Sequence, residues 1–291
     1  MSYPNPVARP WHAGPHRLTP PGRPLVMGIL NATPDSFSDG GRHLDPDAAA
    51  AAGAEMAARG VDMIDVGGES TRPYSEPVDA SEERRRVVPV IERLVDEVDV
   101  PISIDTSKAS VAEAALAAGA TIVNDVTGLE GDPDMSDVVA AGDCGVCVMH
   151  MRGNPRNMQD DPRYDDVVTE VRDYLARRRD AVLRVGVDAE RLCLDPGIGF
   201  GKTHDHNWRL VRHAADFLDL GHPILVGHSR KGFIKKAVGE HGDRDSGTLG
   251  VTLALAAAGV QVVRVHDVAR TIDALTCWQR SRSVPQPEST P

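Results

Sequence analysis

Short apolar runs alternate with helical patterns along most of the chain. The first run, from Val26 to Leu30, is long enough for a strand that is buried on both faces. A helix follows, with Asp45 as the predicted N-cap, Pro46 at the first helical position and Gly60 as the stop. The same order recurs, and strands are predicted at residues 26–30, 61–66, 100–104, 121–123, 145–149, 192–194, 223–226 and 261–265.

Between these runs, apolar residues recur at helical spacing. Residues 81–98 form an amphipathic helix that is expected to begin at the cap Ser81 and to kink at Pro89. Further helices are expected at residues 165–185, 246–259 and 268–280.

Eight strands that alternate with helices in 291 residues predict an α/β fold. A single (β/α)8 TIM barrel, with a parallel eight-stranded core and its active site at the C-terminal rim, suits this length. A doubly wound sheet is the alternative. That fold would need a Gly-rich nucleotide-binding turn after the first strand, where the sequence reads NATPDS instead.

Composition and charge exclude some classes of function. The net charge of −11 argues against a nucleic-acid or anionic membrane surface. No apolar run approaches the ~20 residues of a membrane span. The N-terminal segment is rich in Pro and lacks the apolar core of a signal peptide. We therefore expect a disordered leader at residues 1–23, a barrel at 24–280 and a disordered tail at 281–291, in a cytoplasmic protein that binds neither nucleic acid nor membrane.

Some short motifs are incomplete. Cys144 and Cys147 have C-x-x-C spacing, but no second pair follows, so they are predicted to be small buried hydrophobes. The string GFGKT at 199–203 lacks the first Gly of a P-loop, because Pro196 stands there. The string GHSRK at 227–231 lacks the closing Gly of a nucleophile elbow.

Polar side chains follow the predicted strands. A buried polar group without a partner costs about 1–3 kcal/mol, so a large convergent set indicates a polar ligand. The C-terminal ends of barrel strands share one rim, which holds the active site in barrel enzymes. The set comprises Asn31, Glu69, Ser70, Thr71, Arg72, Asp105, Thr106, Asn124, Asp125, His150, Asp195, Ser229, Arg230, Lys231, Arg264, His266 and Asp267.

Eight strings of the chain resemble one enzyme family. From residue 26 to about residue 280, the strings GILNATPDSFSDGG, DVGGESTRP, SIDTSK, NDVTG, VMHMRGNPRNMQ, LDPGIGFGKT, HSRKGF and RVHDV resemble dihydropteroate synthase, in order. The resemblance implies that 4-aminobenzoate displaces pyrophosphate from 6-hydroxymethyl-7,8-dihydropterin diphosphate, which yields 7,8-dihydropteroate for folate biosynthesis. It also implies a Mg²⁺ cofactor and a homodimer.

The resemblance implies roles for individual residues. It assigns the pterin diphosphate to Thr71, Asp105, Asn124, Met149, Asp195, Phe200, Lys231, Arg264 and His266. It assigns 4-aminobenzoate to Phe37, Thr71, Arg72, Pro73, Ser229 and Lys231. It implies Asn31 as the Mg²⁺ ligand, with Asp35 as a second candidate. The expected catalytic residues are Asp105, Lys231, Arg264 and His266.

The chemistry of these residue types agrees with the roles. The carboxylate of Asp195 suits the paired N–H donors of a pterin edge, and cations such as Arg264 suit a diphosphate. Because the aromatic amine needs little activation, we expect a dissociative, SN1-like displacement without a covalent enzyme intermediate. For Asp105, a salt bridge that orients Lys231 or Arg264 is the competing interpretation.

The chain departs from the family pattern at two positions. Tyr74 stands where Gly is usual, which leaves the path of the loop at 69–80 open, and Arg152 replaces a usual Gln. Two rival functions remain at this point. A methyltetrahydrofolate-type methyltransferase would bind pterin without a diphosphate, and a catalytically silent paralogue would bind pterin only.

Overall fold

The computed structural model describes residues 10–33, 45–71 and 74–283. Its central sheet has the strand order β8-β7-β6-β5-β4-β3-β10-β9, and every neighbouring pair is parallel. A bridge between Leu194 and Ile224 joins β8 to the segment that leads into β9, so the barrel is nearly closed. The strands are β3 (Leu25–Asn31), β4 (Met63–Gly67), β5 (Ile102–Asp105), β6 (Ile122–Asp125), β7 (Gly145–Met149), β8 (Leu192–Asp195), β9 (Leu225–Val226) and β10 (Val262–Val265).

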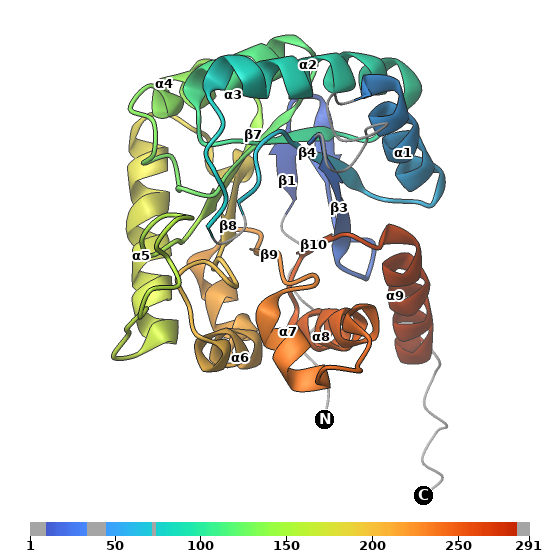
Figure 1. Ribbon diagram of the computed structural model, residues 1–291, viewed down its shortest axis with the longest axis vertical. Helices are drawn as coiled ribbons and strands as arrows, with labels where there is room; N and C mark the ends of the chain where they lie inside the picture. Colours follow the sequence, from blue (N-terminus) through green and yellow to red (C-terminus); the bar gives the residue numbers. More distant parts are fainter. Residues whose placement is uncertain (1–9, 34–44, 72–73, 284–291) are drawn as a thin grey trace, which may run out of the picture.

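Helices surround the barrel (Figure 1). This arrangement confirms the single (β/α)8 barrel and excludes the doubly wound sheet. The helices are α1 (Pro46–Ala58), α2 (Ala80–Glu97), α3 (Ala109–Ala117), α4 (Met135–Ala141), α5 (Val167–Arg184), α6 (His204–Arg212), α7 (Gly232–Val238), α8 (Arg244–Ala258) and α9 (Val268–Ser283).

Capping follows the sequence closely in α1 and less closely in α2. The Asp45 carboxylate accepts the N–H groups of the first turn of α1, as predicted. The predicted cap at Ser81 is wrong. Asp79 caps α2, and the Ser81 hydroxyl donates to the Asp79 carboxylate at 2.6 Å. A carboxylate at this position satisfies the free N–H groups of the helix, so Ser81 lies inside the first turn.

The N-terminal segment corrects another expectation. Strands β1 (Trp11–Ala13) and β2 (His16–Leu18) form an antiparallel hairpin. Trp11 is fully buried, and its indole N–H donates to the Arg191 carbonyl at 2.8 Å, just before β8. The prediction of a disordered leader at residues 1–23 is therefore wrong for the hairpin residues. They are ordered because the indole buries a large apolar surface at the N-terminal mouth of the barrel.

The buried cysteines behave as the sequence indicates. Cys144 is buried just before β7, Cys147 is buried in the middle of β7, and Cys193 is buried in β8. Among the described residues, no helix is both long and apolar enough to cross a membrane.

Candidate active site

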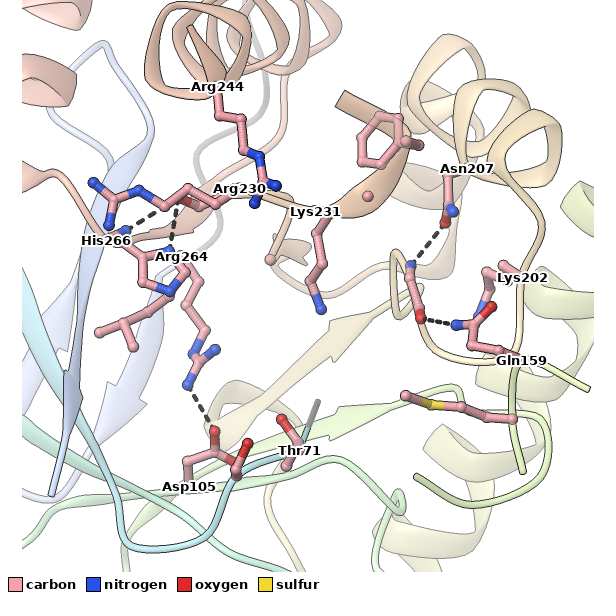
Figure 2. A pocket seen from close by; sticks show the side chains of 18 of the residues that line it. Thr71, Asp105, Gln159, Lys202, Asn207, Arg230, Lys231, Arg244, Arg264 and His266 are labelled. Atoms are coloured by element: carbon pink, nitrogen blue, oxygen red, sulfur yellow. Dashed lines mark hydrogen bonds and ion pairs between the residues drawn. The ribbon is translucent and has the colours of Figure 1, made fainter. Parts of the chain in front are cut away.

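A cavity of about 680 Å³ opens at the C-terminal ends of the strands (Figure 2). The parallel strands all deliver their last residues to this rim, which is why side chains far apart in the sequence meet here. Of the residues singled out from the sequence, the cavity is lined by Asn31, Glu69, Ser70, Thr71, Asp105, Ser229, Arg230, Lys231, Arg264 and His266.

Arg264, from β10, reaches two carboxylates across the barrel. Its Nε lies 2.5 Å from Oδ2 of Asp65, and its Nη2 lies 2.6 Å from Oδ2 of Asp105. Asn124 donates to the same Asp65 oxygen at 3.1 Å. Burial raises the pKa of Asp105 to about 7, and the charge of Arg264 opposes that shift. Asp105 thus forms the salt bridge to Arg264 that the competing interpretation expected.

These carboxylates retain unused acceptors. Asp65 Oδ1 and Asp105 Oδ1 are buried and have no hydrogen-bond partner among the described residues. An unpartnered buried acceptor costs free energy that a ligand with N–H donors can recover. The network thus combines a fixed guanidinium with acceptors for a polar ligand.

Asp195, the last residue of β8, lies close to this network. Its Oδ1 accepts the Gly197 N–H at 2.7 Å, and burial raises the pKa of the carboxyl to about 6. A methyl group placed on Gly227 would lie 4.0 Å from Asp195 Oδ2 and 3.9 Å from Arg264 Cβ. The two side chains therefore converge on one small region, which a single bound molecule can span.

Lys231 projects into the middle of the cavity (Figure 2). It precedes the first residue of α7, and its ammonium lies 4.1 Å from the centre of the Phe200 ring. Burial and the charge of Arg264 together lower the pKa of Lys231 to about 8, and Asp195 and Asp105 oppose the shift. The lysine is consequently a cation at neutral pH, but one that loses its proton readily.

His266 and Ser229 join the ends of β9 and β10. The Ser229 hydroxyl lies 2.9 Å from His266 Nδ1, and it accepts the His266 backbone N–H at 3.2 Å. Arg230 makes a bidentate contact with Asp245, at 2.6 and 2.9 Å. Arg230 is thus partly neutralised, whereas His266 and Ser229 face the cavity together.

Four predicted residues lie beneath the cavity lining. Asn124 hydrogen-bonds Asp65, which bonds the lining residue Arg264. Asp195 lies beside the lining residue Gly227, and Phe200 lies under the lining residue Lys231. Met149 belongs to a small buried apolar cluster with Phe200. The expected residues Asp35, Phe37, Arg72 and Pro73 lie outside the described residues.

Other polar residues at the strand ends are structural. The Asp125 carboxylate accepts backbone N–H groups of Thr127 and Leu129, at 2.7 and 3.0 Å. Asp267 accepts the Arg270 N–H at 3.0 Å in the first turn of α9. Their position after a strand did not distinguish them from ligand-facing residues.

The sequence reading missed several residues of the site. Asp65 is fully buried inside the barrel, and a carboxylate within the apolar strand MIDVG was the available signal. The remaining missed lining residues come mainly from loops and helix starts, where no periodic pattern marks them. They include Tyr74, Met158, Gln159, Lys202, His204, Asn207, Phe233 and Arg244.

Tyr74 resolves the open question about its loop. It adopts a φ of +63°, so the left-handed conformation expected of Gly is retained with a bulky side chain. Its N–H donates to the Pro155 carbonyl at 3.0 Å, and its hydroxyl donates to Asp160 at 3.2 Å. Arg152 lies over the Tyr164 ring at 3.8 Å and pairs with Glu170 at 2.8 Å.

Comparison with known proteins gives a consistent answer. Residues 27–266 match the family of pterin binding enzymes. The chain is 42% identical to dihydropteroate synthase of Neisseria meningitidis serogroup C, over 92% of this chain and 96% of that protein. It is 43% identical to the Escherichia coli K12 enzyme, over 87% and 89% of the two chains.

The chain belongs to the dihydropteroate synthase family. Solved structures of the family agree with this fold. The Xanthomonas albilineans dihydropteroate synthase with 4-aminobenzoic acid superimposes with a TM-score of 0.89 at 46% identity, covering 96% of this chain and all of that one. The same enzyme in complex with 7,8-dihydropteroate gives a TM-score of 0.82 at 45% identity, covering 90% and 95%.

Proposed function

We propose that this chain condenses 6-hydroxymethyl-7,8-dihydropterin diphosphate with 4-aminobenzoate to give 7,8-dihydropteroate and pyrophosphate. Family membership supports this reaction, and so do the dihydropteroate synthase complexes with 4-aminobenzoic acid and with 7,8-dihydropteroate. The observation that carries the proposal is the convergence of Asp195, Lys231 and Arg264 at the rim. A carboxylate and two cations together suit one ligand with an N–H edge and an anionic arm.

Asp195 recognises the pterin in this proposal. Its carboxylate accepts the 2-amino and ring N–H donors of the pterin edge in a bidentate contact. The amide of Asn124 donates and accepts at the ring nitrogens, and Lys231 donates toward the carbonyl side. Met149 and Phe200 supply the apolar surface against the ring. Asp105 and Asp65 add acceptors and offset positive charge.

Arg264 and His266 bind the diphosphate. The barrel rim after the last two strands is a common phosphate site, and Arg264 offers a planar fork of donors. Asn31, at the end of β3, lines the cavity and would hold a Mg²⁺ ion through its amide oxygen, because Mg²⁺ prefers oxygen donors and takes few protein ligands. Bound there, the ion would neutralise charge on the leaving group.

Thr71 and Ser229 contribute to the 4-aminobenzoate site, beside Lys231. By resemblance, Phe37, Arg72 and Pro73 complete it. The amine nitrogen is neutral and nucleophilic at neutral pH, so the chain has no need to activate it. Orientation of the amine toward the pterin methylene is the contribution required of these residues.

The chemical step is a displacement at the pterin methylene carbon. Arg264, Lys231 and His266 stabilise the departing diphosphate while the C–O bond breaks. The dihydropterin ring shares the positive charge left on the carbon, and Asp105 offsets it. The amine then forms the C–N bond and loses one proton to solvent or to the leaving group. No side chain forms a covalent intermediate.

Purified protein tests the function directly. Incubation with the pterin diphosphate, 4-aminobenzoate and Mg²⁺ should release pyrophosphate and dihydropteroate in equal amounts. Chelation with EDTA should abolish turnover, and added Mg²⁺ should restore it. Binding of pterin without turnover would indicate a silent paralogue, and methyl transfer without pyrophosphate would indicate the methyltransferase alternative. We also propose a cytoplasmic homodimer, which sedimentation of the purified chain and fractionation of cells would test.

A further inference from the structure

Lys202, from the string GFGKT, is buried beside the cavity and has no role in the proposed reaction. Only 2% of the residue is exposed. Its ammonium contacts the Phe200 carbonyl at 2.9 Å, the His150 carbonyl at 3.3 Å and His150 Nδ1 at 2.9 Å. An ammonium has three N–H donors, so these three acceptors satisfy it and leave none for a substrate.

The charge state of His150 agrees with this geometry. Burial and the charges of Lys202 and Arg152 together lower the pKa of His150 to about 2, so the imidazole is neutral. A neutral ring has one acceptor nitrogen, and here Nδ1 accepts a hydrogen bond from the Lys202 ammonium. The His150 ring also packs edge-on against Tyr174, with ring centres 4.8 Å apart. Lys202 is therefore anchored on a rigid partner.

These contacts join the loop at residues 195–203 to the end of β7. Gly197 has a φ of +69°, and a side chain there would lie 1.9 Å from the His150 carbonyl. A side chain at Gly201 would lie 2.2 Å from the Arg152 carbonyl. The loop thus packs directly on the backbone that follows β7, and its glycines permit the close approach.

The loop carries two residues of the pterin site. The His150 N–H donates to the Asp195 carbonyl at 3.0 Å, so the position of His150 also sets that of Asp195. The Phe200 carbonyl is a direct partner of Lys202, and the Phe200 ring lies under Lys231. Lys202 therefore contacts the loop and the strand end that hold both pterin-facing residues.

We propose that Lys202 is a positioning residue for pterin recognition. It holds the loop at 195–203 against His150 and thereby fixes the Asp195 carboxylate and the Phe200 ring. When protonated, its ammonium also favours the ionised form of Asp195, although burial lowers the pKa of Lys202 itself well below its usual value. The inference rests on the proposed function, because it assigns the pterin to Asp195.

The Lys202→Met variant tests the role, with Lys236→Met as the control at an exposed position of α7. We expect the Kd for the pterin diphosphate, measured by calorimetry without 4-aminobenzoate, to rise at least about tenfold in Lys202→Met. The KM for 4-aminobenzoate should stay within about twofold of wild type, and Lys236→Met should change neither constant.

The pH profile separates positioning from a general loss of structure. Asp195 is faced by Lys231, Arg264 and Cys147 as well as by Lys202. Loss of the Lys202 charge should move the acid limb of kcat/KM upward from about pH 6, by about half a unit or more. Lys202→Gln keeps N–H donors but no charge, so it should recover part of the pterin affinity and retain the shifted limb.

Several results would overturn the inference. They are a wild-type pterin Kd in both Lys202 variants, an equal loss for the two substrates, or an unmoved acid limb. If Lys202→Met does not fold, the pterin Kd and the acid limb of Lys202→Gln alone test the inference. Because calorimetry needs no turnover, it tests the positioning role even if the wild-type chain makes no dihydropteroate, which is the result that would overturn the proposed function instead.

Discussion

The two ends of the barrel treat buried polar groups differently. At the N-terminal mouth, the Arg191 guanidinium donates to the carbonyls of Cys144 and Val139, at 2.8 and 2.6 Å, and Trp11 donates to the Arg191 carbonyl. At the C-terminal rim, Asp65 and Asp105 share Arg264, and each keeps a buried oxygen without a partner among the described residues. The guanidinium at the N-terminal mouth thus bonds the backbone, whereas the one at the rim bonds carboxylates that retain acceptors for a ligand.

The largest effect should come from Arg264→Ala. The variant removes the guanidinium that the diphosphate needs and leaves two buried carboxylates without their cation. We expect kcat/KM to fall by about a thousandfold or more, and the free energy of unfolding to fall by about 3–5 kcal/mol. Steady-state kinetics and urea denaturation measure the two quantities. Turnover at the wild-type rate would contradict the assigned role.

Trp11→Ala tests the opposite end. Loss of the fully buried indole should lower the free energy of unfolding by about 3–5 kcal/mol. Because the hairpin does not line the cavity, kcat/KM of the folded variant should match that of wild type at a temperature well below its Tm. A selective loss of pterin affinity would show that the hairpin supports the site rather than the barrel alone.

Asp195→Asn should separate binding from stability. The amide has one acceptor oxygen and an NH2 group that only donates, so it cannot make a bidentate contact with two parallel N–H donors, and the Kd for the pterin diphosphate should rise about a hundredfold. The buried carboxylate has a raised pKa of about 6, so its ionisation disfavours folding as the pH rises through that value. At pH 7.5 the variant should thus unfold at an equal or higher Tm. A lower Tm together with unchanged pterin affinity would contradict a ligand-binding role.

The smallest expected effect is the gradual change of kcat/KM with pH, which should give a bell-shaped profile for the pterin diphosphate. Asp105 and Asp195 must both be ionised, so activity should fall below about pH 7 and more steeply below about pH 6. Lys231 must be protonated, so activity should also fall above about pH 8. Asp195→Asn should lose the steeper part of the acid limb, and Lys231→Arg should lose the alkaline limb. Limbs that stay unchanged in these variants would belong to other groups.

The sequence predicted the barrel well because strand burial is periodic and local. The eight apolar runs match strands β3 to β10, and polar residues at their ends mark the rim. It could not show that both carboxylate oxygens of Asp125 accept N–H groups of its own loop, whereas Asp195 uses one oxygen in this way among the described residues, since both residues end a strand. It also missed Asp65 and Lys202, whose roles depend on contacts across the barrel.

A crystal structure with bound pterin diphosphate tests the central claim most directly. The proposed site places the amino edge of the ring within hydrogen-bond distance of the Asp195 carboxylate, with the diphosphate on Arg264 and His266. A ring bound with its amino edge away from Asp195, or a diphosphate that contacts neither cation, would contradict the account.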